Sequence, residues 1–224
     1  MSMMSLNIAK QTCLLLCLLT VIGVNGKEKK QDAGSWLNIS VTPKTIADRW
    51  SLTCSVEHRS RENFSETSLW SGMTNVYYHF NSHFKLGAGC EYFLNKGADG
   101  TYSSEYRYYP AAYLSYQKGF LAGSFRSCLM NTFTQWKEPN WEMRHKLKIS
   151  AQWKGVCLKP FVAVEPYHKL CMDDDYFFNR IRYSLGVSCG VSYHHQFDIY
   201  YLCENIVPKA LINNVLAIDY HFSF

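Results

Sequence analysis

Charged residues are scarce in this chain: they make up 18% of its 224 residues, against 47% hydrophobic residues. This balance excludes a disordered protein, because disorder requires low hydrophobicity and high net charge. Heptads rich in Glu, Lys, Ala and Leu are also missing, which excludes a coiled coil. The formal net charge of +5 is too small to indicate a nucleic-acid partner. The length suits a single domain.

Long apolar runs are missing except at the N-terminus, and the mean hydropathy is -0.20. Residues 12–24 (TCLLLCLLTVIGV) form an apolar run that is too short to span a bilayer as a helix. A weakly basic segment precedes this run and small residues follow it, which is the order of regions in an export signal. We therefore predict a cleavable signal peptide at 1–26 and one domain at 27–224.

Cys-x-x-Cys pairs are absent, and the cysteines after the predicted signal are odd in number, so they cannot all pair within one chain. These cysteines are Cys54, Cys90, Cys128, Cys157, Cys171, Cys189 and Cys203. About one falls in each predicted strand, which suits small apolar fillers, with Cys128 and Cys157 on the opposite face. The Asp173–Asp175 run is either a weak cation site or, more commonly, a solvated loop. We predict no metal site and no cofactor.

From Arg49 onward, apolar and polar residues alternate with the period of a β-strand, and no segment shows a sustained helical period. About ten strands are predicted, at 49–59, 69–80, 83–93, 106–116, 120–130, 141–153, 156–167, 179–193, 197–204 and 216–224. The stretch 36–41 also alternates. It is either an eleventh segment folded against the rim, which would leave 27–48 outside the main barrel, or half of an added hairpin that makes twelve strands.

The two faces of these strands favour a transmembrane β-barrel over a soluble one. The segments reach the length needed to cross a bilayer at a tilt, and short turns alternate with longer loops. Trp141 and Trp153 lie at the ends of an apolar row, where aromatic side chains meet a membrane interface, and the chain ends in Phe224. The prediction is an all-β, antiparallel, up-and-down barrel. A soluble, exported, lipocalin-like binder is the alternative, because alternation alone does not say which face meets water.

Several spaced motifs carry a resemblance to a known family. They are EHRSR at 57–61, YYHF at 77–80, GAGCEY at 87–92, NRIRYSLG at 179–186 and NVLAIDYHFSF at 214–224. Together they resemble the family named domain of unknown function 2490, which consists of bacterial, presumed outer-membrane β-barrels. The resemblance covers nearly the whole mature chain. It implies a fold and a location only, because this family has no assigned chemistry.

If the polar face points inward, the barrel encloses many charged side chains. The candidate interior ladder consists of Glu57, Arg59, Lys85, Glu91, Arg126, Glu142, Arg144, Lys146, Lys148, Lys159, Glu165, Arg180, Arg182, Asp198, Glu204 and Asp219. A barrel of about ten strands is little wider than its side chains can fill, so we expect these charges to pair. The ladder is then structural, or else it lines a narrow path for small anions, as the basic row Arg144, Lys146 and Lys148 suggests.

Catalysis is a separate alternative, because small outer-membrane barrels include lipid hydrolases and acyltransferases. Histidines lie near predicted strand ends, at His79, His83, His194, His195 and His221. However, no Gly-x-Ser-x-Gly elbow is present, and no Ser, His and acid share a spacing that strands would bring together. We therefore predict no catalytic residues and keep a lipid-modifying enzyme as the second hypothesis.

The expected location is the bacterial outer membrane, reached through the signal peptide. The expected partners are membrane lipid, including the lipopolysaccharide leaflet, and the barrel-assembly machinery, which would bind the strand that ends in Phe224. We expect a monomer that does not bind nucleic acid.

Overall fold

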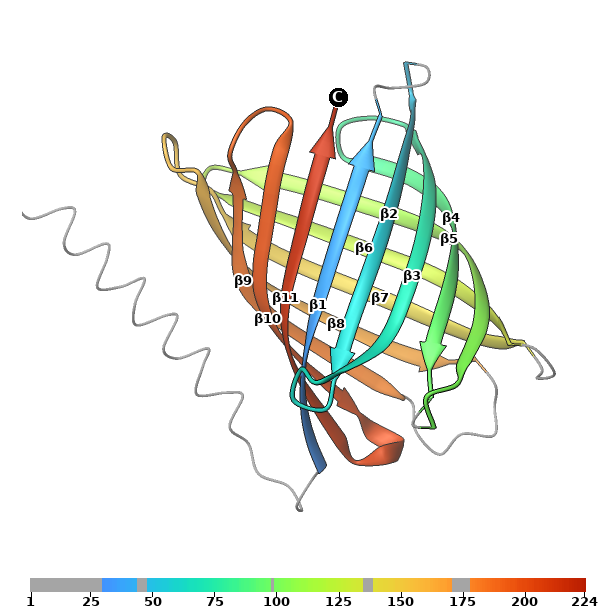
Figure 1. The fold of residues 1–224 in the computed structure, drawn as a ribbon. Coiled ribbons are helices and arrows are strands. Elements are labelled where there is room, and N and C mark those ends of the chain that lie inside the picture. The colour runs from blue at the N-terminus through green and yellow to red at the C-terminus, as the bar shows by residue number, and fades with distance from the viewer. Residues whose placement is uncertain (1–29, 44–47, 98, 135–138, 171–177) are drawn as a thin grey trace, which may run out of the picture.

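The computed structural model describes residues 30–43, 48–97, 99–134, 139–170 and 178–224 (Figure 1). The predicted signal peptide, Cys171 and the Asp173–Asp175 run therefore lie outside the described residues. One short 3-10 helix, η1 (Val207–Lys209), accompanies the strands. The strands are β1 (Lys30–Thr42), β2 (Trp50–Arg61), β3 (Glu66–His79), β4 (Phe84–Lys96), β5 (Tyr102–Lys118), β6 (Leu121–Thr134), β7 (Asn140–Ala151), β8 (Leu158–Lys169), β9 (Arg180–Gly190), β10 (His195–Ile206) and β11 (Leu211–Ser223).

The strands close into one barrel in the order β1-β11-β10-β9-β8-β7-β6-β5-β4-β3-β2. All neighbours are antiparallel except β1 and β11, which run parallel from the pair Lys30 and Leu211 to the pair Thr42 and Ser223. The predicted all-antiparallel barrel of ten or twelve strands is therefore wrong in its closure. An odd number of alternating strands leaves the first and last pointing the same way, so eleven strands can close only through a parallel pair. The alternating stretch at 36–41 belongs to β1 in the wall and does not lie against the rim.

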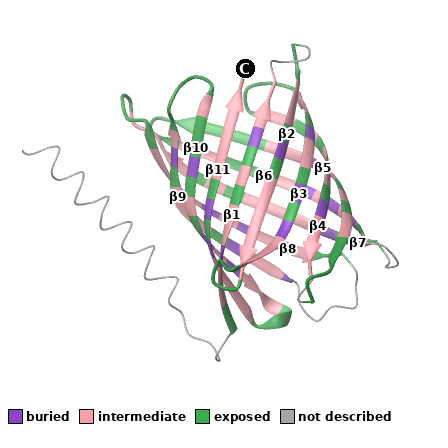
Figure 2. Ribbon diagram, in the orientation of Figure 1, coloured by how far each residue is buried: buried purple, intermediate pink, exposed green. Residues whose placement is uncertain are grey.

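The strand period places apolar side chains on the outside of the wall and charged ones on the inside. On β7, for example, Leu147 and Ile149 are 43% and 46% exposed, whereas Glu142 is 4% exposed. Exposed residues occur along the outer wall, interspersed with buried ones on the same strands (Figure 2). Alternation thus predicted the two faces correctly, and the outward face is the apolar one.

The connections at the two ends of the barrel overlap in length. The end that carries the C-terminus has connections at 43–49, 80–83, 119–120, 152–157 and 191–194. The opposite end has connections at 62–65, 97–101, 135–139, 170–179 and 207–210. The expected strict alternation of short and long loops is therefore wrong. The shortest connection is the turn at 119–120 between β5 and β6. Gly119 allows this turn, because its φ of +61° is accessible to glycine without steric cost.

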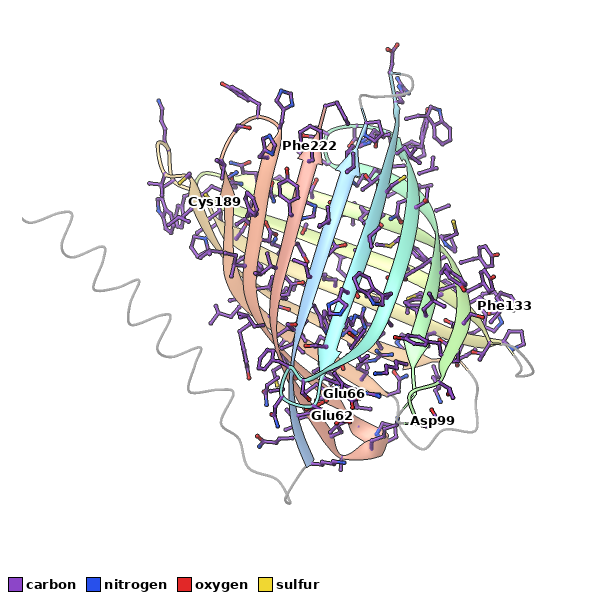
Figure 3. All side chains as sticks on the ribbon, viewed as in Figure 1. Glu62, Glu66, Asp99, Phe133, Cys189 and Phe222 are labelled. Atoms are coloured by element: carbon purple, nitrogen blue, oxygen red, sulfur yellow. The ribbon has the colours of Figure 1, made fainter. Side chains whose placement is uncertain are left out.

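Aromatic side chains gather at both ends of the outer wall. At the C-terminal end, Trp50 packs on Tyr78 with ring centroids 4.9 Å apart, and Phe222 packs on Phe224 at 4.7 Å. At the opposite end, Tyr108 and Phe133 lie 6.0 Å apart. Figure 3 shows Phe222 near the C-terminal end and the acidic residues Glu62, Glu66 and Asp99 in and beside the turns of the opposite end.

The cysteines are free thiols in the described chain. Cys128 is buried in the interior, whereas Cys157 lies exposed in the connection between β7 and β8. Cys54 and Cys90 are exposed. No helix among the described residues is long and apolar enough to cross a membrane.

Candidate functional site: the charged barrel interior

Charged side chains of β6 to β10 form one connected group on the inner wall, which we name the arginine cluster. Its seven members are Arg126, Arg144, Arg180, Arg182, Glu142, Glu165 and Glu204. The strand period brings them together, because every second side chain of these strands points inward.

Glu165 on β8 is the centre of the arginine cluster. Its Oε1 accepts hydrogen bonds from Arg126 at 2.6 Å and from Arg144 at 2.7 Å. Its Oε2 accepts one from the Tyr167 hydroxyl at 3.2 Å and lies 3.7 Å from Arg182. A carboxylate offers about four lone-pair sites, and four groups occupy them here. Glu165 is therefore saturated by its neighbours.

A lateral row of opposite charges continues from Glu165 around the wall. Glu165, Arg182 and Glu204 are register partners on β8, β9 and β10. Arg182 donates from Nε to Glu204 at 2.8 Å, and the Asn213 amide donates to the same carboxylate at 2.9 Å. Arg180 lies 3.5 Å from Glu204 and 3.8 Å from Glu142. Glu165 and Glu204 are thus each bound from at least two strands, which ties neighbouring parts of the wall together.

Two aromatic side chains fill the space between the arginines. Tyr167 is only 2% exposed and lies under the guanidinium groups of Arg144, Arg180 and Arg182, at 5.1, 4.5 and 4.9 Å from its ring centroid. Trp36 of β1 lies under Arg182 at 4.6 Å. Arginine stacks well on aromatic faces. These rings therefore pack against the guanidinium groups, and both of them line an interior cavity.

Nearer the C-terminal end lies a cavity of about 410 Å³ that is lined by lysines, which we name the lysine cavity. Its cationic lining consists of Lys85, Arg126, Lys146 and Lys148. Lys148 pairs with Asp198 at 3.1 Å. The Lys85 ammonium instead lies over two aromatic rings, 4.2 Å from the centroid of Tyr77 and 5.0 Å from that of Tyr113.

Those rings occupy space that glycines leave free. A Cβ at Gly87 would lie 2.8 Å from Cδ1 of Tyr77 and 3.2 Å from Cε2 of Tyr113. A side chain at this inward position would therefore displace the rings on which Lys85 rests.

A second interior cavity, of about 400 Å³, is lined by five of the seven members of the arginine cluster. Arg126 and Lys146 line both cavities, so their side chains mark the boundary between them. The charged rows of the interior are continuous around the wall, whereas the open space along the lumen is divided at this boundary.

The structure places the predicted interior charges on the inner wall, where all but Lys159 make an interior contact or line a cavity. Lys159 lies on the inward row near the end of β8, opposite Ser188. Sequence reasoning missed Arg107, which lies 3.4 Å from Glu91, and Glu105, which lines the second cavity. Their alternation with Tyr106 and Tyr108 was the signal that identifies them.

Within the described part of the chain, two contacts join a serine hydroxyl to a histidine ring, both between inward-facing side chains. Ser51 contacts Nε2 of His79 at 2.8 Å, and Ser40 contacts Nδ1 of His221 at 2.5 Å. Among the described residues, no carboxylate hydrogen-bonds either histidine, so neither contact extends to a triad. His194, at the strand end, donates to the carbonyl of Ser223 at 2.6 Å, as an end cap would.

The structure thus defines a closed β-barrel with an apolar outside and a charged inside. Residues 33–211 match the family described as protein of unknown function (DUF2490), and the chain belongs to that family.

Similarities to characterised proteins are distant. No curated protein matches the chain. A solved KdgM porin shares 15% identity at a TM-score of 0.43, over 78% of this chain and 89% of the porin. The same porin, in complex with disordered oligogalacturonate, matches with 13% identity and a TM-score of 0.44 over 79% and 90%. The β domain of the Bordetella autotransporter BrkA shares 12% identity at a TM-score of 0.43, over 80% and 85%.

Proposed function

We propose that this chain is an integral β-barrel of the bacterial outer membrane whose lumen is largely occluded. Its role is then structural, or that of a narrow pore with a charged interior. The observation that carries the proposal is the polarity of the wall, with charged residues inside and apolar residues outside.

The outward apolar face favours a lipid environment over water. In a lipocalin-like soluble barrel, the apolar rows would fill the inside and the charged rows would face solvent. Here Ile199 and Leu216 are 48% and 51% exposed on the outside, whereas Arg182 is 4% exposed inside. A continuous apolar surface of this extent is stable in a bilayer and prone to aggregate in water.

The spacing of the aromatic residues fits the thickness of a bilayer. The ends of β7 are separated by roughly 40 Å, for twelve residues at about 3.3 Å each, and Trp141 lies at one end while Trp153 lies in the connection just beyond the other. With a strand tilt of about 45°, this separation corresponds to roughly 28 Å across the barrel, close to the apolar core of a membrane. The two aromatic ends would then lie at the two interfaces.

The filled interior supports low conduction. An eleven-stranded barrel is slightly wider than one that side chains alone can fill, and the arginine cluster with Tyr167 and Trp36 takes up part of that extra width. The remaining space is divided at Arg126 and Lys146.

The second candidate, a lipid-modifying enzyme, has the Ser51–His79 and Ser40–His221 contacts in its favour. Both contacts face the charged interior, where acyl chains would have to leave the bilayer to reach them. Incubation of the purified protein with phospholipid and lipid A tests this candidate. Release of fatty acid that is lost in His79→Ala or His221→Ala would establish the enzyme and overturn the structural role.

The proposal also concerns the C-terminal residue Phe224, the partners of the barrel and its oligomeric state. Phe224 ends the strand that follows β10, and its side chain is 66% exposed beside Phe222. We propose that this strand is the one the barrel-assembly machinery binds, and that lipid, including the lipopolysaccharide leaflet, surrounds a monomeric barrel.

Heat-modifiable mobility in detergent gels, combined with outer-membrane fractionation, tests the location. The proposal expects the unheated protein to migrate faster than the heated protein and to fractionate with the outer membrane. A protein that remains in the soluble periplasmic fraction, with no mobility change on heating, would contradict it.

A further inference from the structure

A lateral row of inward-facing side chains crosses five strands at the floor of the lysine cavity. The register pairs join His79 to Lys85, Lys85 to Tyr113, Tyr113 to Arg126, and Arg126 to Lys146. Neighbouring strands lie about 4.8 Å apart, so the cationic groups of this row are held at fixed intervals. Lys148 faces the same cavity from the next inward position of β7.

Two of these cations have no carboxylate partner. Among the described residues, no carboxylate oxygen lies within the 4.0 Å ion-pair distance of Lys85 or Lys146, whereas Arg126 and Lys148 are paired with Glu165 and Asp198. Glu165 is on the strand next to Lys146, but Arg126, Arg144, Arg182 and Tyr167 already occupy its oxygens. Two ammonium groups in a confined site therefore have no carboxylate in direct contact, which is costly when the surroundings are partly dry.

The cavity has room for a counter-charge larger than a single ion. Its volume of about 410 Å³ lies within the range of small-molecule sites. Its lining includes polar groups of the 80–83 turn, and this turn lies at the C-terminal end of the barrel, so the cavity is reached from that end.

We propose that the lysine cavity binds a small oxyanion carrying two negative charges, a phosphate or a dicarboxylate. Lys85 binds one side of the anion and Lys146 the other, while Arg126 and Lys148, already neutralised by their own carboxylates, offer further N–H donors. The tyrosine rings under Lys85 fix the position of its ammonium. This inference rests on the proposed function and deepens it, because it assigns a soluble ligand to one part of the barrel lumen.

The test uses the full-length protein, purified in a zwitterionic detergent, and isothermal titration calorimetry with inorganic phosphate and with succinate. Glucose serves as a neutral probe of similar size. The proposal expects saturable binding of both anions, with an affinity that falls as the salt concentration rises, and no binding of glucose.

Substitutions then locate the site. Lys85→Met and Lys146→Met each remove one unpaired ammonium, and each should weaken binding by about tenfold or more, because a charge-assisted hydrogen bond is lost. The matched control is Lys118→Met, which removes an exposed lysine at the same end of the barrel without touching the cavity. The double control, Lys118→Met with Lys154→Met, has the same net charge as a variant that combines Lys85→Met with Lys146→Met, and it should bind within about twofold of wild type.

Heat-modifiable mobility shows whether each variant is folded, and the wild-type titrations stand even if one variant is not. Absence of phosphate and succinate binding at millimolar concentrations would overturn the inference, as would an equal loss in the Lys118 and Lys154 controls. Binding of anionic lipid in nanodiscs without binding of free phosphate would also overturn it, because the ligand would then be a headgroup.

If anions bind but the protein fractionates as soluble, the proposed function fails while the site stands. If the protein is a closed barrel in the outer membrane that binds neither anion, only the site fails.

Discussion

The arginine cluster and the lysine cavity lie in the same lumen, but their charges are balanced differently. In the arginine cluster, every guanidinium has a carboxylate partner, and Glu165 alone is shared by Arg126, Arg144 and Arg182. In the lysine cavity, Lys85 and Lys146 have no such partner among the described residues. The planar, multi-donor guanidinium joins several strands through one carboxylate, whereas a point-like ammonium does not. The first region is therefore built to hold the barrel, and the second is able to bind a ligand.

The largest loss of stability is expected when Glu165, the centre of the arginine cluster, loses its charge. Glu165→Gln leaves three arginines facing a neutral amide in a confined space, and breaking a buried ion pair in this way costs about 3–5 kcal/mol. Urea unfolding in lipid vesicles measures the change in the free energy of unfolding. Glu62→Gln, at a 57% exposed side chain in the 62–65 turn, is the control and should change stability by less than about 1 kcal/mol. Equal effects of the two changes would show that the arginine cluster does not stabilise the barrel.

Overpacking beside the lysine cavity should have an intermediate effect. Gly87→Val places methyl groups against Tyr77 and Tyr113, which costs about 1–3 kcal/mol in a packed site. Gly123→Val is the matched control, because a Cβ at Gly123 meets no atom within 4 Å. The same unfolding measurement distinguishes them. A neutral Gly87→Val would mean that the two tyrosine rings are not held in place.

Removal of an unpaired lysine should change stability little. Lys146→Met deletes a charge that has no carboxylate partner in the described chain, so a loss of at most about 1 kcal/mol, or a gain, is expected. Arg182→Met provides the contrast, since it breaks pairs with Glu165 and Glu204 and should cost about 3 kcal/mol or more. If Lys146→Met destabilises the barrel as strongly as Arg182→Met, the distinction between the two regions is wrong.

The smallest effect is expected outside both regions, in the 97–101 turn. A hydrogen bond from the Thr101 hydroxyl to Asp99, together with one from the Thr101 backbone N–H, lowers the pKa of the Asp99 carboxyl. A lowered pKa stabilises the folded state at neutral pH, and this contribution is lost as the pH falls through the folded pKa. The difference in stability between wild type and Asp99→Asn should therefore shrink from pH 6 to pH 3. A constant difference would contradict the role of ionised Asp99.

The sequence predicted the strands and their two faces, because a period of two assigns each side chain to one face regardless of its neighbours. It did not predict which charges meet. Glu165 contacts Arg126 from β6 and Arg182 from β9, and these pairs depend on lateral register, which alternation within one strand does not specify. The prediction of how the barrel closes was wrong for the same reason. The alternating row at 36–41 was recognised, but the parallel pairing of β1 with β11 is a long-range contact.

Single-channel recording in planar bilayers tests most directly whether the charged interior occludes the lumen. Refolded wild-type protein is expected to give no large, stable conductance steps, because the arginine cluster fills one part of the lumen and Arg126 and Lys146 divide the remaining space. Arg126→Ala combined with Lys146→Ala should raise the conductance by removing that boundary. Large, steady steps from the wild-type protein would contradict the account.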